Sequence, residues 1–282
     1  MTTRTVTAAG YRCGVTIHSP GAEKDRGAAV LYLHGGGLLY GERDDLPRPY
    51  LDAFLAEGYT LFCLDYPLAP EVPIGDIHRA VLEGWLRLLE EELPSRGIGR
   101  YFLFGRSAGA YLALILAKGL AGREVLRPAG VLDFYGYYDM ADDFVTAPSA
   151  YYNTLPEVPA RWADRFRGGE PVTSGPKLQR FSLYIYARQK GAWKELLGGP
   201  AVEDPAWSLS PEEIRALPPL FITASSGDRD VPFRVSKALS RQAPRAVMKP
   251  VYYLEHDFDR DTGNPEGMRV YRECLDWMAE VE

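Results

Sequence analysis

Short apolar runs alternate with longer amphipathic segments along most of the chain. Runs of strand length lie at residues 11–18, 28–33, 59–64, 101–104, 130–135, 219–224 and 248–254. Several are apolar on both faces, as is typical of strands in a sheet covered on both sides. The amphipathic segments predict helices near 47–57, 76–93, 107–119, 233–243 and 266–280. This alternation predicts an α/β fold with a mostly parallel, doubly wound sheet and helices on both faces.

One long segment interrupts this alternation. Between Tyr135 and Pro219, more than eighty residues pass without a clear core strand, although amphipathic stretches predict helices near 158–167 and 176–197. A long insertion at the carboxyl end of a strand is where an α/β sheet commonly builds its ligand site.

We therefore expect two parts: an α/β core formed by residues 1–136 and 211–282, and a mainly helical lid inserted at 137–210. The lid is rich in Tyr and Trp. Each ring taken singly is better explained by packing of the lid onto the core. Taken together, the rings favour an apolar pocket that tolerates aromatic groups.

The stretch 103–111, "LFGRSAGAY", places Ser107 between an apolar strand and a predicted helix. Small residues surround the serine, including Gly105 and Gly109. This G-x-S-x-G pattern at a strand-to-helix turn is typical of a nucleophile elbow, where strand and helix pass so closely that neighbours must be small. An ordinary helix N-cap serine is the alternative, but the context favours a catalytic nucleophile.

A glycine-rich loop follows an earlier predicted strand, in the stretch 31–41, "LYLHGGGLLYG". Glycines let backbone N–H groups approach a substrate oxygen without interference from side chains. We expect Gly36, Gly37 and Ala108 to donate these N–H groups to an oxyanion. His34 precedes the serine in the chain, so we interpret it as a residue that organises the loop rather than as the base.

A serine nucleophile needs a base and a carboxylate that orients the base. Of the four histidines, only His256 follows both the serine and a strand-terminal aspartate. His18 and His78 precede the elbow and are interpreted as structural or surface residues, with His78 on the polar side of a helix. Asp228 and Asp230 compete for the orienting role, and Asp228 is favoured because it comes first after its strand.

Together these motifs resemble the α/β-hydrolase superfamily, and within it the hormone-sensitive-lipase-like (fold-3) esterases. The shared features are "HGGGLLYG", "LDYPLAPE" at 64–71, "GRSAG", the Asp228 turn and His256. The resemblance extends over residues 28 to 280. Departures occur at Arg106, where the family often has an acidic residue, at Ala110 in place of a glycine, and at Pro67. The family's N-terminal cap also looks short here.

The resemblance and the residues together predict a carboxylesterase that cleaves short-chain acyl esters through an acyl-enzyme on Ser107. Asp228 and His256 complete the triad, and no metal or organic cofactor is expected. The same triad also serves amide-cleaving enzymes of the arylformamidase or aminopeptidase kind. A third alternative is a non-catalytic protein that binds a small molecule in the same fold.

Charge and composition restrict the partners. The formal net charge of −6, without a run of five like charges, argues against a nucleic-acid or anionic-membrane surface. We find no signal peptide or apolar stretch of 18 residues, and Cys13, Cys63 and Cys274 lack metal-binding spacing. The simplest interpretation is a cytoplasmic enzyme with reduced thiols and a small-molecule ester substrate. The sequence is compatible with a monomer or a homo-oligomer.

Overall fold

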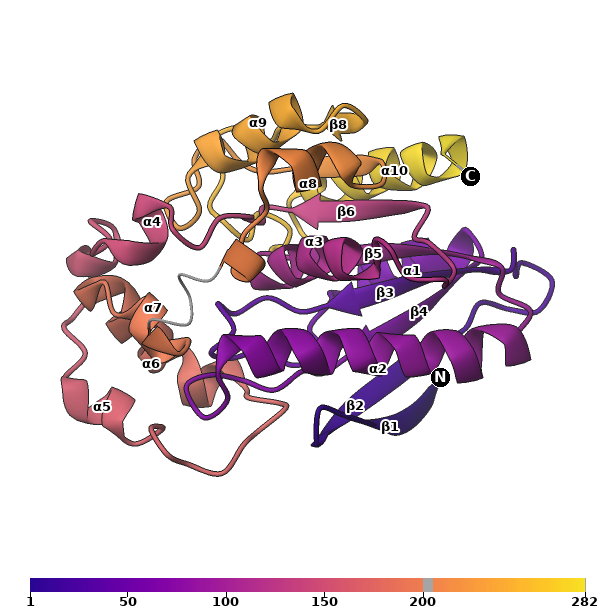
Figure 1. Ribbon diagram of the computed structural model, residues 1–282. Helices are drawn as coiled ribbons and strands as arrows, with labels where there is room; N and C mark the ends of the chain where they lie inside the picture. Colours follow the sequence, from indigo (N-terminus) through magenta and orange to yellow (C-terminus); the bar gives the residue numbers. More distant parts are fainter. Residues whose placement is uncertain (200–204, 282) are drawn as a thin grey trace.

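A single twisted sheet forms the centre of the computed structural model, which describes residues 1–199 and 205–281 (Figure 1). Within those residues the sheet has eight strands in the order β1-β2-β4-β3-β5-β6-β7-β8. The strands are β1 (Thr2–Ala8), β2 (Tyr11–His18), β3 (Ala28–Leu33), β4 (Tyr59–Leu64), β5 (Arg100–Arg106), β6 (Gly130–Phe134), β7 (Leu220–Thr223) and β8 (Ala246–Met248). From β4 to β8 all neighbouring strands are parallel, whereas β1 and β2 are antiparallel to their neighbours.

Helices cover both faces of this sheet. The helices of the core are α1 (Arg48–Ala56), α2 (Ile74–Ser95), α3 (Ala108–Leu120), α8 (Pro211–Ala216), α9 (Phe233–Gln242) and α10 (Pro265–Glu280). Alternate residues of the central strands point to opposite sides, so Leu31 packs in the cluster with α2 and α3, whereas Val30 packs with α1 and α10. The predicted doubly wound, mostly parallel α/β architecture is confirmed.

The segment 137–210, called the insertion segment below, projects beyond the carboxyl ends of the parallel strands (Figure 1). Its described elements are α4 (Asp143–Thr146), η1 (Tyr152–Thr154), α5 (Ala160–Asp164), α6 (Lys177–Lys190), α7 (Trp193–Leu196) and η3 (Pro205–Trp207). The helix predicted at 176–197 is two helices, because Gly191 ends α6 in a left-handed conformation with φ of 64°. Residues 200–204 of this segment lie outside the described residues.

The predicted strand at 248–254 is wrong in its position. Strand β8 ends at Met248. Beyond it, the N–H groups of Lys249 and Val251 still donate to the carbonyl oxygens of Ile222 and Ala224, and Val251 forms an isolated bridge with Ser225. Tyr253 has a positive φ of 62°, so the chain leaves the extended conformation before it reaches His256. His256 therefore lies on a loop beyond the strand, not at its end.

The N-terminus contains a strand that the sequence pattern did not indicate. Strand β1 pairs with β2 in an antiparallel hairpin through Ala9 and Gly10, both with positive φ. The residues before β3 thus extend the sheet, and the short cap expected there is a hairpin.

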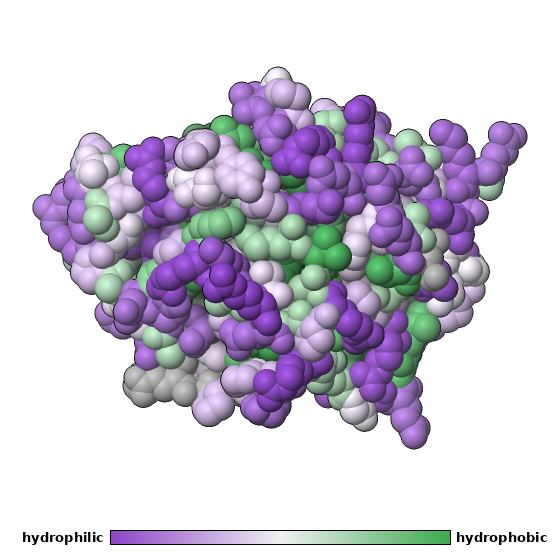
Figure 2. All heavy atoms as spheres, turned by 90° about the horizontal axis from the view of Figure 1, so that it is seen from above, coloured by the Kyte–Doolittle hydropathy of each residue, from purple (hydrophilic) through white to green (hydrophobic). Residues whose placement is uncertain are grey.

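The outer surface is largely polar where α8, α9 and α10 lie. Figure 2 shows hydrophilic side chains over most of this face, with apolar ones gathered mainly near its middle. In the part of the chain that the structure describes, we find no helix whose length and hydrophobicity would let it span a lipid bilayer.

Candidate active site

Ser107 lies at the corner between β5 and α3, with φ of 54° and ψ of −118°. This backbone conformation is strained for a residue with a side chain. A Cβ on Gly105 would lie 2.0 Å from the carbonyl carbon of Gly109, and one on Gly109 would lie 1.9 Å from the carbonyl oxygen of Leu33. Both positions must therefore be glycine, which explains why the sequence removes bulk around this serine.

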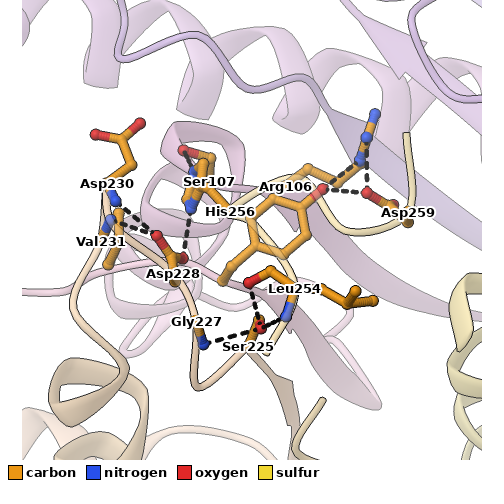
Figure 3. A network of polar contacts seen from close by, with 12 residues as sticks. Arg106, Ser107, Ser225, Gly227, Asp228, Asp230, Val231, Leu254, His256 and Asp259 are labelled. Atoms are coloured by element: carbon orange, nitrogen blue, oxygen red, sulfur yellow. Dashed lines mark hydrogen bonds and ion pairs between the residues drawn. The ribbon is translucent and has the colours of Figure 1, made fainter. Parts of the chain in front are cut away.

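Three predicted residues meet at this corner. The Oγ of Ser107 lies 2.8 Å from Nε2 of His256, and Nδ1 of His256 lies 2.6 Å from Oδ2 of Asp228 (Figure 3). Asp228 is fully buried, and its other oxygen accepts hydrogen bonds from the N–H groups of Asp230 at 2.8 Å and Val231 at 2.9 Å. A carboxylate held by two backbone donors keeps one orientation, and here that orientation faces the imidazole.

The loops that carry Asp228 and His256 are joined by Ser225. Its hydroxyl donates to the carbonyl oxygen of Leu254 at 2.6 Å and accepts from the N–H groups of Gly227 at 3.2 Å and Leu254 at 3.0 Å (Figure 3). The acid and the base are therefore held relative to each other by a side chain as well as by the sheet.

The competing acid, Asp230, points away from His256 toward the insertion segment. Its carboxylate accepts hydrogen bonds from the hydroxyl of Tyr184 at 2.8 Å and that of Tyr152 at 3.1 Å. It also lies 3.2 Å from Nε of Arg188, while the Arg188 Nη2 donates to the Asp230 carbonyl oxygen at 2.9 Å. Asp230 thus joins the insertion segment to the core, and Asp228 is the acid that contacts the imidazole.

The glycine-rich loop lies beside the serine. Gly36 and Gly37 have positive φ values of 106° and 62°, and both line the same small cavity as Ser107 and His256. Ala108 is the first residue of α3 and is buried directly behind the serine. Within the described residues, no hydrogen-bond acceptor pairs with the N–H groups of these three residues. Their donors remain available for an anion.

The insertion segment also holds this loop. The indole N–H of Trp193 donates to the carbonyl oxygen of Gly37 at 2.9 Å, which fixes the orientation of that peptide. A Cβ on Gly37 would lie 2.3 Å from the ring of Tyr184, so the ring packs directly on the glycine.

Two of the other three histidines, His34 and His78, have structural positions. His34 is buried, its ring stacks on Tyr66, and its Nδ1 lies 2.8 Å from the carbonyl oxygen of Gly35, which agrees with an organising role. The placement of His78 on a polar helix face is wrong. His78 is buried against Tyr111 and Trp207, and this burial lowers its pKa to about 3.

The cavity at Ser107 is small, about 50 Å³, and its walls are more polar than the sequence suggested. Its lining includes the tyrosines Tyr40, Tyr135 and Tyr184 together with the charged residues Asp45, Arg106, Asp230, Asp257 and Arg260. The expectation of an apolar pocket is therefore wrong. Most rings of the insertion segment pack against one another instead, as Tyr137 does against Trp193 and Phe144.

The electrostatics of the imidazole depend on its carboxylate neighbours. Burial alone would lower the pKa of His256, but the negative charge and hydrogen bond of Asp228 raise the pKa above its usual value of 6.5, with a further contribution from Asp230. The protonated imidazole is thus stabilised by this site. Among residues 1–199 and 205–281, no group of three or more His, Cys, Asp or Glu side chains is arranged to hold a metal ion.

Comparison with known families agrees with this geometry. Residues 30–257 match a family model described as the alpha/beta hydrolase fold. The chain belongs to the α/β-hydrolase fold-3 family. The match begins in β3 and ends just beyond His256, so it includes every motif on which the resemblance was based. The family and the fold class predicted from the sequence are both confirmed, and the chain is a hydrolase of that family.

Solved structures with this fold superpose on almost the whole chain. A protein of unknown function from Staphylococcus aureus superposes with a TM-score of 0.86 at 30% identity, covering 100% of this chain and 99% of that one. An alpha/beta hydrolase superfamily protein from Enterococcus faecalis gives 0.85 at 36% identity, covering 99% of each. Carboxyl esterase 2 of Tuber melanosporum gives 0.71 at 17% identity, covering 99% and 86%, and shares the fold.

Curated sequence relatives are much longer proteins. A non-reducing polyketide synthase of Aspergillus calidoustus is 30% identical over 165 residues, which cover 51% of this chain and 6% of that protein. A non-reducing polyketide synthase of Aspergillus terreus is 28% identical over 194 residues, covering 64% and 7%. The chain therefore matches only a small part of each of these synthases.

One group of residues at the site was not identified from the sequence. Arg106 was noted only as a departure from the family pattern, and Asp259, which pairs with it, was not noticed. The signal available in the sequence was the stretch "HDFD" at 256–259, which places an acidic residue three positions after His256.

Proposed function

We propose that this hydrolase is a serine carboxylesterase that cleaves short-chain acyl esters. The observation that carries the proposal is the continuous set of contacts from Ser107 through His256 to Asp228, at the edge of a cavity lined by Gly36 and Gly37. In this arrangement the serine is activated by a base that is itself oriented by a buried acid.

The reaction begins when Ser107 attacks the ester carbonyl and His256 takes its proton at Nε2. Asp228 accepts the hydrogen bond from Nδ1–H, so it selects the tautomer that leaves Nε2 free and stabilises the imidazolium that forms. His256 then gives the proton to the leaving alcohol. A water molecule attacks the acyl-enzyme by the same steps and releases the acid.

The N–H groups of Gly36, Gly37 and Ala108 stabilise the oxyanion of each tetrahedral intermediate. Each donor of this kind contributes on the order of 3 kcal/mol to catalysis. We assign Trp193 a supporting role, because its hydrogen bond to the Gly37 carbonyl fixes the loop that carries two of the donors.

We further propose that residues 137–210 act as a lid over the core formed by 1–136 and 211–282. The contacts of Tyr184 with Gly37 and with Asp230 support this division, because they attach the segment to both sides of the serine. A cavity of only about 50 Å³ beside Ser107 favours a small acyl group.

The ester assignment is tested with p-nitrophenyl esters, an anilide and an aryl formamide. We expect p-nitrophenyl acetate and butyrate to be cleaved with higher kcat/KM than p-nitroacetanilide or N-formylkynurenine, an aryl formamide. Faster cleavage of the anilide or the formamide would replace the esterase with an amide hydrolase. Absence of turnover on every substrate, in a folded protein that still binds them, would indicate a binding protein.

A further inference from the structure

A buried ion pair connects the two segments that carry the nucleophile and the base. Nη2 of Arg106 lies 2.9 Å from Oδ1 of Asp259 (Figure 3). Both residues are buried. Arg106 directly precedes Ser107 in the chain, and Asp259 follows His256 by three residues. The pair therefore lies one residue from the nucleophile and within the same turn as the base.

A tyrosine from a third segment completes the connection. The hydroxyl of Tyr135 accepts from Nε of Arg106 at 2.7 Å and donates to Oδ1 of Asp259 at 2.7 Å. Its ring centroid lies 4.8 Å from that of His256 and 5.5 Å from that of Phe258. Tyr135 has a positive φ of 46°, an uncommon conformation for a residue of this size, so the surrounding contacts must hold it.

Both oxygens of Asp259 are used. The second oxygen accepts from the hydroxyl of Tyr271 on α10 at 2.8 Å. Asp259 thus anchors the histidine turn to β5 through Arg106, to the end of β6 through Tyr135 and to α10 through Tyr271. These contacts fix the turn on the side of His256 opposite to Asp228.

Stability alone does not require charges at this place. A buried ion pair is commonly no more stabilising than apolar residues of the same volume, because both ions lose their hydration. A planar guanidinium and a carboxylate do, however, fix distance and direction more strictly than packed methyl groups. That property matters most where two atoms must stay at 2.8 Å, as Ser107 Oγ and His256 Nε2 do.

We infer that Arg106, Tyr135 and Asp259 are positioning residues for the reaction: together they set the place of His256 relative to Ser107. This inference rests on the proposed function, because it requires that His256 act on Ser107. Arg106 belongs to this group although it lines the cavity, since its Nη2 and Nε are engaged by Asp259 and Tyr135.

The experiment compares four variants and one control with the wild-type enzyme. One variant, Arg106→Met, removes both the charge and the donors of the guanidinium. Asp259→Asn keeps the shape and removes the charge, Tyr135→Phe keeps the ring and removes the hydroxyl, and Arg106→Lys keeps the charge without the planar fork. Glu92→Gln is the matched control. Glu92 is also buried and paired, with Arg96 at 3.1 Å and with Arg4, but it lies on α2 and contacts neither catalytic segment.

For each protein, kcat and KM are measured on p-nitrophenyl butyrate, and the rate of fluorophosphonate labelling of Ser107 is followed. The proton between His256 Nδ1 and Asp228 is observed by proton NMR. We expect Asp259→Asn to lower kcat by roughly 100-fold, as a displacement near 1 Å does, while KM stays near the wild-type value. Tyr135→Phe should lower kcat by about tenfold, since it removes one of the contacts.

Arg106→Lys should retain more activity than Arg106→Met, and the Nδ1 proton should shift or broaden in the slow variants only. Glu92→Gln should keep the wild-type kcat and the wild-type resonance. Wild-type kcat and an unshifted resonance in folded Tyr135→Phe and Asp259→Asn would overturn the positioning role. Equal loss of kcat in Glu92→Gln would also overturn it, because the effect would then be one of stability.

If Asp259→Asn does not fold, Tyr135→Phe decides the question alone, since it removes only a hydroxyl. A wild-type protein that is not labelled at Ser107 would contradict the proposed function and, with it, the positioning role. Labelling of the wild type together with unaffected variants would contradict the positioning role only.

Discussion

Two aspartates, two residues apart in one turn, serve two different regions of the molecule. Asp228 faces the α/β core and contacts His256, whereas Asp230 faces the insertion segment and contacts Tyr184 and Arg188. The core side is fixed largely by backbone geometry: the strained corner at Ser107 and the buried acid held by two N–H groups. The insertion side depends on contacts between side chains.

We infer from this difference that the core side carries out the reaction and that the insertion side attaches residues 137–210 to the core. We assign the proton transfers to the core side, and we assign closure of the cavity and support of the glycine-rich loop to the insertion side. Changes on the core side should therefore lower kcat without loss of stability, and changes on the insertion side should mainly lower stability and alter substrate preference. The predictions below test that separation, beginning with the largest effect.

Ser107→Ala, a change on the core side alone, should abolish esterase activity. Loss of the nucleophile in a triad costs on the order of a millionfold in kcat. The melting temperature should not fall, because a smaller side chain at a strained corner removes no packing that the elbow needs. Steady-state assays and thermal unfolding measure both. Activity near the wild-type level in the purified variant would end the triad assignment.

The two aspartates should respond in opposite ways to the same substitution. Asp228→Asn should lower kcat by roughly 10⁴-fold, because an amide stabilises the wrong imidazole tautomer. Asp230→Asn should instead lower the free energy of unfolding by roughly 3–5 kcal/mol, because it leaves the buried guanidinium of Arg188 without a negatively charged partner. Chemical denaturation and kinetics on both variants give the comparison, and the reverse ranking in kcat would give the catalytic role to Asp230.

The pH dependence of kcat/KM should distinguish Asp228 from Asp230. His256 acts as a base only when neutral, so activity is lost as pH falls through its raised pKa, and the rising limb of kcat/KM should lie above pH 6.5. Asp228 raises that pKa more than Asp230 does, so Asp228→Asn should move the limb further toward low pH than Asp230→Asn. An unchanged limb in Asp228→Asn would contradict the assigned contact.

The dependence of kcat/KM on acyl chain length tests the insertion side. The change expected for each added methylene is the smallest effect among these predictions. Each methylene buried in an open pocket would contribute about 0.8 kcal/mol of binding. In a cavity of about 50 Å³ further methylenes meet the walls instead, so kcat/KM should peak between acetyl and butyryl esters and then fall. A steady rise through decanoyl esters would show that the insertion segment leaves an open channel.

Much of the core could be predicted from the sequence, because physical constraints at individual residues determine which amino acids stand there. Gly105 and Gly109 are small because the strand and helix touch there, and this requirement leaves a pattern in the sequence. Asp228 and His256 follow strands in the chain order that the fold imposes. Local sequence and global fold agree at these places, so the motifs predict the geometry.

The rest depends on contacts that join distant parts of the chain. Arg106 and Asp259 are 153 residues apart, and neither side chain reveals its partner from local sequence. The character of the cavity was predicted wrongly for the same reason: the rings of the insertion segment were recognised, but which of them face Ser107 depends on packing. Similarly, the apolar run at 248–254 did not reveal that regular pairing of β8 ends at Met248, or that Tyr253 turns the chain out of the extended conformation.

The central claim, that Ser107 carries the acyl group, is tested most directly by trapping that intermediate. The protein is mixed with p-nitrophenyl butyrate, quenched in acid within the first turnovers, and examined by intact-mass and peptide mass spectrometry. We predict a butyryl adduct on the peptide that contains Ser107, absent from Ser107→Ala. An adduct on another residue, or product formation with no adduct on any residue under these conditions, would contradict the account.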